Sequence, residues 1–228
     1  MLVVLNLLAG SFASQITTLL VGVEEREYRV RQDLLSSNSP YFAAAVKEEW
    51  EEGQERRISL LDDSAAAVDL YIQWIYNKRI FCRQPLEEIE KGQEELGVLI
   101  DGFIFGEKIQ DGDFKDAIID ALIASVSTIG KEDRYWYPSG EMVDRAYKGT
   151  PPGSPLRRLL IDMHVHHGCR DWVEDGACPE FLIDLVRDLL DVCNVSHMSD
   201  PTTQQVSSCP YHHHGDDFQC YREKILEE

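Results

Sequence analysis

The change from strand to helix that sets the fold falls in residues 28–42, which read YRVRQDLLSSNSPYF. Tyr28 and Val30 alternate with charged residues, and this alternation is typical of a strand with one buried face. Ser39 followed by Pro40 is typical of a helix start, because serine caps the first free N–H groups and proline fits the first turn. The stretch therefore predicts a strand that leads into helices.

The residues before this stretch predict a second strand. Ile16 to Val21 is a β-rich run, and Gly22 to Glu25 supplies a turn before the strand that covers Glu27 to Arg31. Together these segments predict a half-buried β-hairpin.

After Pro40, the next apolar residues recur at helical spacing. Phe42, Val46 and Trp50 are four residues apart, which predicts one helix through all three. Arg57 to Leu61 reads as a short strand, and Ser64 is placed to cap the following helix. The apolar stripe of that helix consists of Val68, Tyr71, Ile72 and Ile75, enlarged by Trp74 and Tyr76.

Beyond Pro85 every apolar pattern has the period of a helix. The four stripes are Leu96, Leu99, Ile100 and Phe103; Phe114, Ala117, Ile118, Ala121 and Leu122; Leu156, Leu159, Leu160 and Met163; and Leu182, Leu185, Val186 and Leu189. Asp113 is expected to cap the second of these helices, and the turn-rich segment 130–155 is expected to connect the second to the third.

These elements predict an α+β fold, in which a small sheet is flanked by helices and followed by a helical extension and a polar tail. We expect four segments, with boundaries taken from where the patterns change. They are an apolar N-terminal segment at 1–15, the α+β domain at 16–126, the helical extension at 127–194, and a tail containing Cys and His at 195–228.

Charge argues against nucleic acid or an anionic membrane as partner. The chain has 228 residues and a formal net charge of −19, which repels phosphate over most of its surface. Two basic clusters, Lys78 to Arg83 and Arg157 with Arg158, are expected to be solvated. Met1 to Ala13 is apolar but too short to span a bilayer, and it lacks the basic start of a secretory signal. We expect an intracellular protein, with nucleus and cytoplasm not distinguished.

The residues from Tyr28 to Tyr76 resemble the BTB (POZ) family. Ser36 to Phe42 is similar to the family's S-x-x-S-x-Y-F turn, and Trp74-Ile75-Tyr76 is similar to its helix end. The family usually carries histidine where Arg31 stands. The resemblance covers residues 16 to about 126, and the part beyond 130 resembles the C-terminal part of fungal-type members.

This resemblance implies a non-enzymatic module for protein–protein interaction, with homodimers formed through the N-terminal strand and first helix. Family members that recruit cullin scaffolds of ubiquitin ligases carry an apolar residue, any residue and Glu after the second helix. Trp50-Glu51-Glu52 falls at that place. Trp50 and Glu52 are therefore candidate partner-binding residues of a cullin adaptor, while the alternative places Trp50 in the core.

The sequence carries no phosphate-binding glycine loop, G-x-S-x-G elbow, H-E-x-x-H helix or C-x-x-C pair. We therefore expect neither catalysis nor a cofactor. Cys209, His212, His214 and Cys220 offer two thiols and two imidazoles, which would suffice for a tetrahedral zinc site. Their spacing is unusual, so an unliganded loop is the preferred interpretation and zinc binding the alternative.

Overall fold

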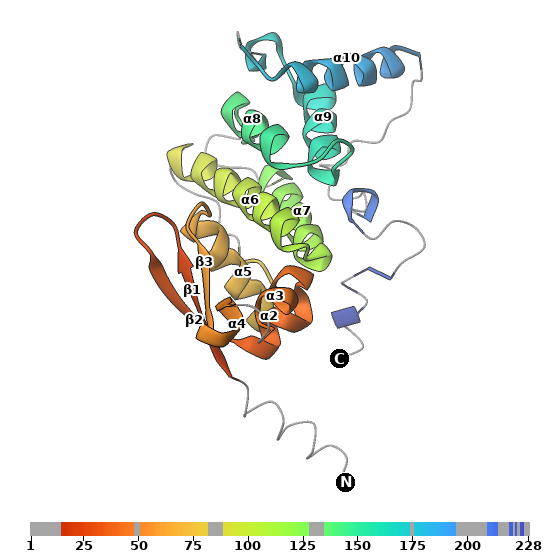
Figure 1. Ribbon diagram of the computed structural model, residues 1–228. Helices are drawn as coiled ribbons and strands as arrows, with labels where there is room; N and C mark the ends of the chain where they lie inside the picture. The colour runs from red at the N-terminus through yellow and green to blue at the C-terminus, as the bar shows by residue number, and fades with distance from the viewer. Residues whose placement is uncertain are drawn as a thin grey trace.

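The structure is a computed structural model that describes residues 15–47, 51–81, 89–127, 135–173, 176–194 and 209–213, together with residues 219, 220, 222, 224 and 225. A small sheet lies at one end, helices cover it, and further helices stack away from it (Figure 1). The predicted α+β class is confirmed. Within these residues, no helix combines the length and the apolar character that crossing a membrane requires.

The sheet has three strands in the order β2-β1-β3. β1 (Ile16–Val21) pairs antiparallel with β2 (Arg26–Arg31), as the predicted hairpin requires, and parallel with β3 (Arg57–Leu60) on its other side. One face of this sheet is buried under helices. Its buried residues are Leu19, Val21, Val30, Ile58 and Leu60.

Four short helices surround the sheet: α2 (Gln32–Asn38), α3 (Pro40–Ala45), α4 (Glu51–Glu55) and α5 (Ala65–Asn77). Ser39 caps α3 as predicted, because its side chain accepts the N–H of Phe42 at 3.1 Å. At the opening of α5, Ser64 occupies the N-cap position without the expected side-chain bond.

The helix predicted through Phe42, Val46 and Trp50 is shorter than expected. α3 ends at Ala45, where the N–H of Lys47 bonds to the carbonyl of Ala44 at 3.2 Å and tightens the last turn. Phe42 is fully buried, whereas Val46 is only partly buried against the core. A four-residue period therefore identified the buried face correctly, but it did not determine where the helix ends.

Aromatic side chains join the sheet unit to the first long helices, α6 (Ile89–Ile109) and α7 (Gly112–Ser127). The ring of Tyr71 on α5 lies 5.8 Å from Phe42, 5.7 Å from Phe105 and 5.1 Å from Phe114, centroid to centroid. Ser39 also donates its hydroxyl to the carbonyl of Ile109 at 2.6 Å. The sheet and the first helix pair thus share one core.

α7 is capped by Asp111 rather than by Asp113. Oδ1 of Asp111 accepts the N–H of Phe114 at 2.9 Å, while Asp113 lies in the first turn. The prediction was wrong by two residues because both aspartates precede the same apolar stripe, and only the backbone path at Gln110, where φ is positive, selects the cap.

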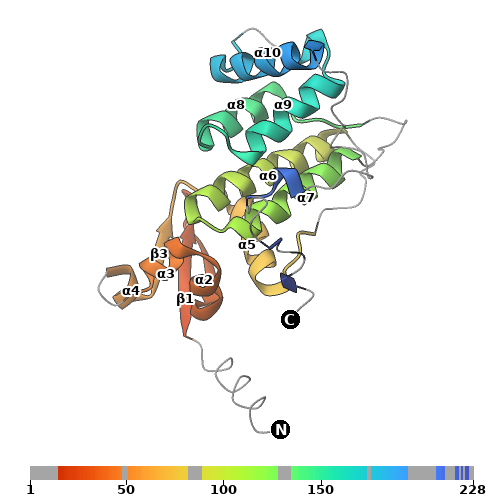
Figure 2. The same ribbon diagram turned by 90° about the vertical axis from the view of Figure 1, so that its right-hand side faces the viewer.

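The remaining helices stack on this pair in layers (Figure 2). α8 (Gly140–Gly149) packs on α6, and α9 (Pro155–His167) packs on α8. α10 (Pro179–Asn194) then packs on both α8 and α9, at the end of the molecule farthest from the sheet (Figures 1 and 2).

Arg157, which the sequence placed on a solvated face, is buried instead. Its guanidinium donates to Oγ1 of Thr150 at 3.1 Å and to Glu180 at 2.9 Å, and it also bonds the carbonyls of Tyr147 and Thr150. The planar cation stacks over the Tyr147 ring at 4.3 Å. Arg157 therefore ties the end of α8 to the starts of α9 and α10.

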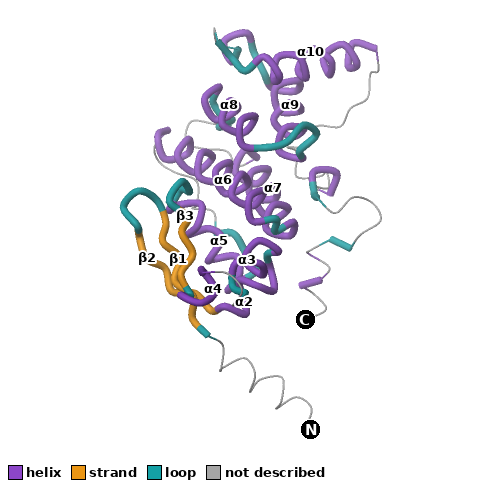
Figure 3. The backbone as a smooth tube through the Cα atoms, viewed as in Figure 1, coloured by secondary structure: helices purple, strands orange, loops and turns teal. Residues whose placement is uncertain are grey.

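The described part of the C-terminal tail lies beside the helix stack, near α7 (Figure 3). Its short 3₁₀ turn η3 (Cys209–Tyr211) packs on α9, where the Tyr211 hydroxyl donates to Asp162 at 2.6 Å. Farther along, Arg222 pairs with Asp120 at 2.8 Å and Lys224 with Asp113 at 2.8 Å. The tail is thus held to α7 and α9 by polar contacts.

Candidate functional site

The most conspicuous feature of the helical stack is an apolar outer face on α10. Four large side chains on this face are substantially exposed, and we call them the α10 face: Ile183, Val186, Leu189 and Leu190. The exposed fractions of Ile183 and Val186 are 51% and 53%. The inner side of the same helix buries Phe181 and Leu185 against the rest of the stack.

The position of α10 explains why this face is unusual. α10 packs on α8 and α9 and is the last helix of the stack among the residues that the structure describes (Figure 2). A terminal helix in a stacked helical protein ordinarily has a polar outer face, because that face meets water. The α10 face departs from this rule.

Carboxylates crowd the flank of α10. Asp184, Asp188 and Asp191 follow one another at helical spacing, and burial together with Asp162, Asp191 and Asp184 raises the pKa of Asp188 above its usual range. Arg187 lies within this series and places an opposing charge 3.5 Å from Asp184. The rim of the α10 face is therefore acidic.

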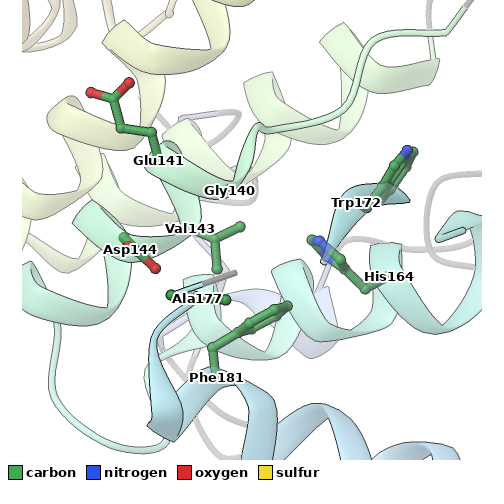
Figure 4. A pocket seen from close by; sticks show the side chains of 9 residues that line it. Gly140, Glu141, Val143, Asp144, His164, Trp172, Ala177 and Phe181 are labelled. Carbon is green, nitrogen blue, oxygen red and sulfur yellow. The ribbon is translucent and has the colours of Figure 1, made fainter. Parts of the chain in front are cut away.

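A cavity of about 190 Å³ lies beneath α10, between the start of α8, the middle of α9 and the segment before α10. Figure 4 shows His164 and Trp172 on one side of it, Asp144 on the other and Phe181 at its edge.

Asp144 and His164, which line this cavity, already have structural partners. Oδ1 of Asp144 accepts the N–H of Cys178 at 3.0 Å, and Nδ1 of His164 lies 2.7 Å from the carbonyl of Leu160. The His164 ring also meets the edges or faces of Trp172 and Phe181, and its burial lowers its pKa. An uncharged imidazole donating to Leu160 fits a packed seam between helices, so we assign this cavity a structural role.

The two candidate partner-binding residues have different outcomes. Glu52 is exposed on α4 and so is open to a partner. Trp50 lies outside the described residues, and the choice between an exposed and a core Trp50 stays a prediction.

Three of the four candidate metal ligands come together. Ligand atoms of Cys209, His212 and Cys220 all lie within 4.8 Å of one another, although eight and eleven residues separate Cys220 from the other two in sequence. His214 lies outside the described residues. Among the residues described, no other group of three or more such side chains is placed to hold a metal ion.

Sequence reasoning missed two parts of these sites. The apolar stripe of α10 was predicted, but periodicity carries no signal that would have shown Val186 and Leu189 exposed. Asp116 and Asp120, which lie four residues apart on α7 and meet His212, could have been found only by knowing that the tail returns to α7.

When the chain is compared with family models and with curated proteins, nothing matches in either case.

Proposed function

We propose that this chain is a protein-interaction module and that its docking surface is the α10 face. The observation that carries the proposal is the exposure of Ile183 and Val186 on the terminal helix of the stack. Large apolar side chains grouped on one exposed face favour association, because covering them removes apolar surface from water. The resemblance to the BTB family supports the same class of function.

The partner that fits this face is a basic amphipathic helix from another protein. A second helix laid along α10 would cover its outer face, with apolar residues inserted between Ile183, Val186 and Leu190. Lys and Arg beside those residues would meet Glu180, Asp184 and Asp191 on the rim. The net charge of −19 would also speed the approach of a basic partner.

A second copy of this chain fits less well. Four partly exposed side chains offer little beside the roughly 800 Å² per partner that a standard stable interface buries. Two copies would also bring like-charged rims together at a chain charge of −19 each. Self-association through the N-terminal strand and first helix, with Met1 to Val21 contributing, is implied by the family resemblance and remains a separate prediction. Cullin binding through Trp50 and Glu52 also remains a prediction.

A designed peptide tests the docking surface directly. The probe is a synthetic amphipathic helix with Leu on one face and Lys on the other, and its partner control carries Glu in place of Lys. Fluorescence anisotropy at physiological ionic strength would measure the binding of each peptide to the full chain. We expect the Leu/Lys peptide to bind and the Leu/Glu peptide not to bind.

Two variants separate docking from general charge attraction. Val186→Glu places a charge in the apolar face and should weaken binding of the Leu/Lys peptide at least tenfold, or about 1.4 kcal/mol. Val23→Glu is the matched control, since Val23 is 95% exposed in the β1–β2 turn, at the other end of the molecule. Both variants make the chain more acidic, so attraction by charge alone would strengthen binding. Equal or tighter binding to Val186→Glu would contradict the proposal.

A further inference from the structure

The Cys/His group of the tail has the geometry of a metal site. Sγ of Cys220 lies 3.3 Å from Nδ1 of His212, and Sγ of Cys209 completes a triangle whose atoms are all within 4.8 Å of each other. Tetrahedral zinc, with Zn–S of about 2.3 Å and Zn–N of about 2.0 Å, sets its sulfur and nitrogen ligands about 3.5 Å apart and two sulfurs about 3.8 Å apart. Small shifts would bring the three atoms to these spacings.

The contact that Nε2 makes orients the His212 imidazole so that Nδ1 can bind a metal ion. Nε2 of His212 lies 2.9 Å from Oδ1 of Asp120, and Asp120 is itself paired with Arg222 at 2.8 Å. A proton on Nε2 directed at this carboxylate leaves the lone pair of Nδ1 facing Cys220. A carboxylate that holds the second nitrogen in this way is the usual support of a metal-bound histidine.

The fourth ligand would have to come from outside this group of three, and α7 offers a buried carboxylate near His212. Oδ2 of Asp116 lies 4.0 Å from Nδ1 of His212, and the Asp116 side chain is almost fully buried. Its other oxygen accepts the N–H of His213, which holds the carboxylate toward the tail. Asp116 and Asp120 come from successive turns of α7, so one helix supplies both groups.

We propose that Cys209, His212 and Cys220 bind a zinc ion, with Asp116 at the fourth position, and that the ion fastens the C-terminal tail to α7. Two thiolates and one imidazole favour zinc over magnesium or calcium, which take oxygen ligands. With Asp116 bound, all four positions would be filled by the protein, and such a closed site is structural rather than catalytic. The proposal does not depend on docking at the α10 face.

Metal content and a cobalt spectrum of the full chain are the decisive measurements. We expect about one zinc per chain in reduced protein after dialysis against micromolar zinc. Replacement by cobalt should give the intense visible bands of tetrahedral cobalt together with near-ultraviolet bands from two thiolates. Zinc content and the cobalt spectrum of the wild-type chain decide whether the site binds a metal ion, even if a variant fails to fold.

Matched variants locate the site. Cys220→Ser should lose both the bound zinc and the cobalt bands, whereas Cys169→Ser, at an exposed cysteine outside the cluster, should keep both. Asp120→Asn tests the positioning carboxylate and should weaken zinc binding about 10- to 100-fold without moving the cobalt bands.

Three results would overturn the proposal. One is reduced wild-type protein that takes up no zinc at micromolar concentration. Another is zinc that Cys169→Ser loses as fully as Cys220→Ser does. The third is a disulfide between Cys209 and Cys220, found by mass spectrometry in protein purified with a thiol reductant, because it would leave no thiolates for a metal.

Discussion

α9 and α10 carry the same kind of apolar stripe, but they differ in how far its side chains are buried. On α9, Leu156, Leu159, Leu160 and Met163 are all at most 1% exposed, whereas on α10 Val186 is 53% exposed. α9 packs against α8, α10 and the tail turn η3, while α10 packs against α8 and α9 at the end of the described stack. Helical periodicity therefore identifies an apolar face, but the neighbours decide whether that face is a core or a surface.

The largest expected effect is a difference in the free energy of unfolding that the same Leu→Ala change costs on α9 and on α10. Leu159→Ala should lower the free energy of unfolding by about 3 kcal/mol, because it leaves a cavity in a fully buried site. Leu189→Ala makes the same change at a side chain that is 41% exposed and should cost less than about 1 kcal/mol. Urea denaturation measures both, and equal losses would mean that the two helices are equally covered in solution.

A smaller effect should appear as a dependence on pH at the seam between these helices. Burial lowers the pKa of His164 below its ordinary 6.5, although the hydrogen bond to the Leu160 carbonyl acts in the opposite direction. Below about pH 6.5 the unfolded chain takes up a proton that the folded chain does not. The free energy of unfolding should therefore fall as the pH drops from 7 toward 5, with no contribution from His164 above pH 7.

Paired substitutions assign this slope to one residue. His164→Gln should flatten the decline relative to the wild type, measured by urea denaturation at several pH values. His167→Gln removes a half-buried imidazole from the same helix and serves as the control. A decline that persists unchanged in His164→Gln would show that other groups govern acid stability.

Local rules of sequence predicted much of the fold. The hairpin, the Ser39 cap, the strand at Arg57 and the stripes of α5, α6, α7 and α9 were all predicted from alternation, capping and helical spacing. Each of these depends on residues that are close in sequence. Tyr76 was an exception, because it was added to the α5 stripe and is 49% exposed at the end of that helix.

The features that sequence could not predict depend on contacts between distant segments. Arg157 is buried because the ends of α8 and the start of α10 supply its acceptors, and nothing near Arg157 in sequence indicates this. His212, which lies between Cys209 and Cys220 in the tail, meets Asp120 because the tail packs on α7. Spacing alone made these ligands look unpromising, since the usual zinc patterns have two close pairs of ligands and this tail has only one.

The smallest expected effect is also the sharpest check on the contrast between the two helices. Val186→Ala should change the free energy of unfolding by no more than about 0.5 kcal/mol, since the side chain is half exposed and alanine favours a helix more than valine does. A loss well above 1 kcal/mol would mean that the α10 face is already covered in the isolated protein, and docking of a partner helix there would be contradicted. Measuring the melting temperature over a range of protein concentrations would then identify the cover, because a second copy makes stability rise with concentration and a segment of the same chain does not.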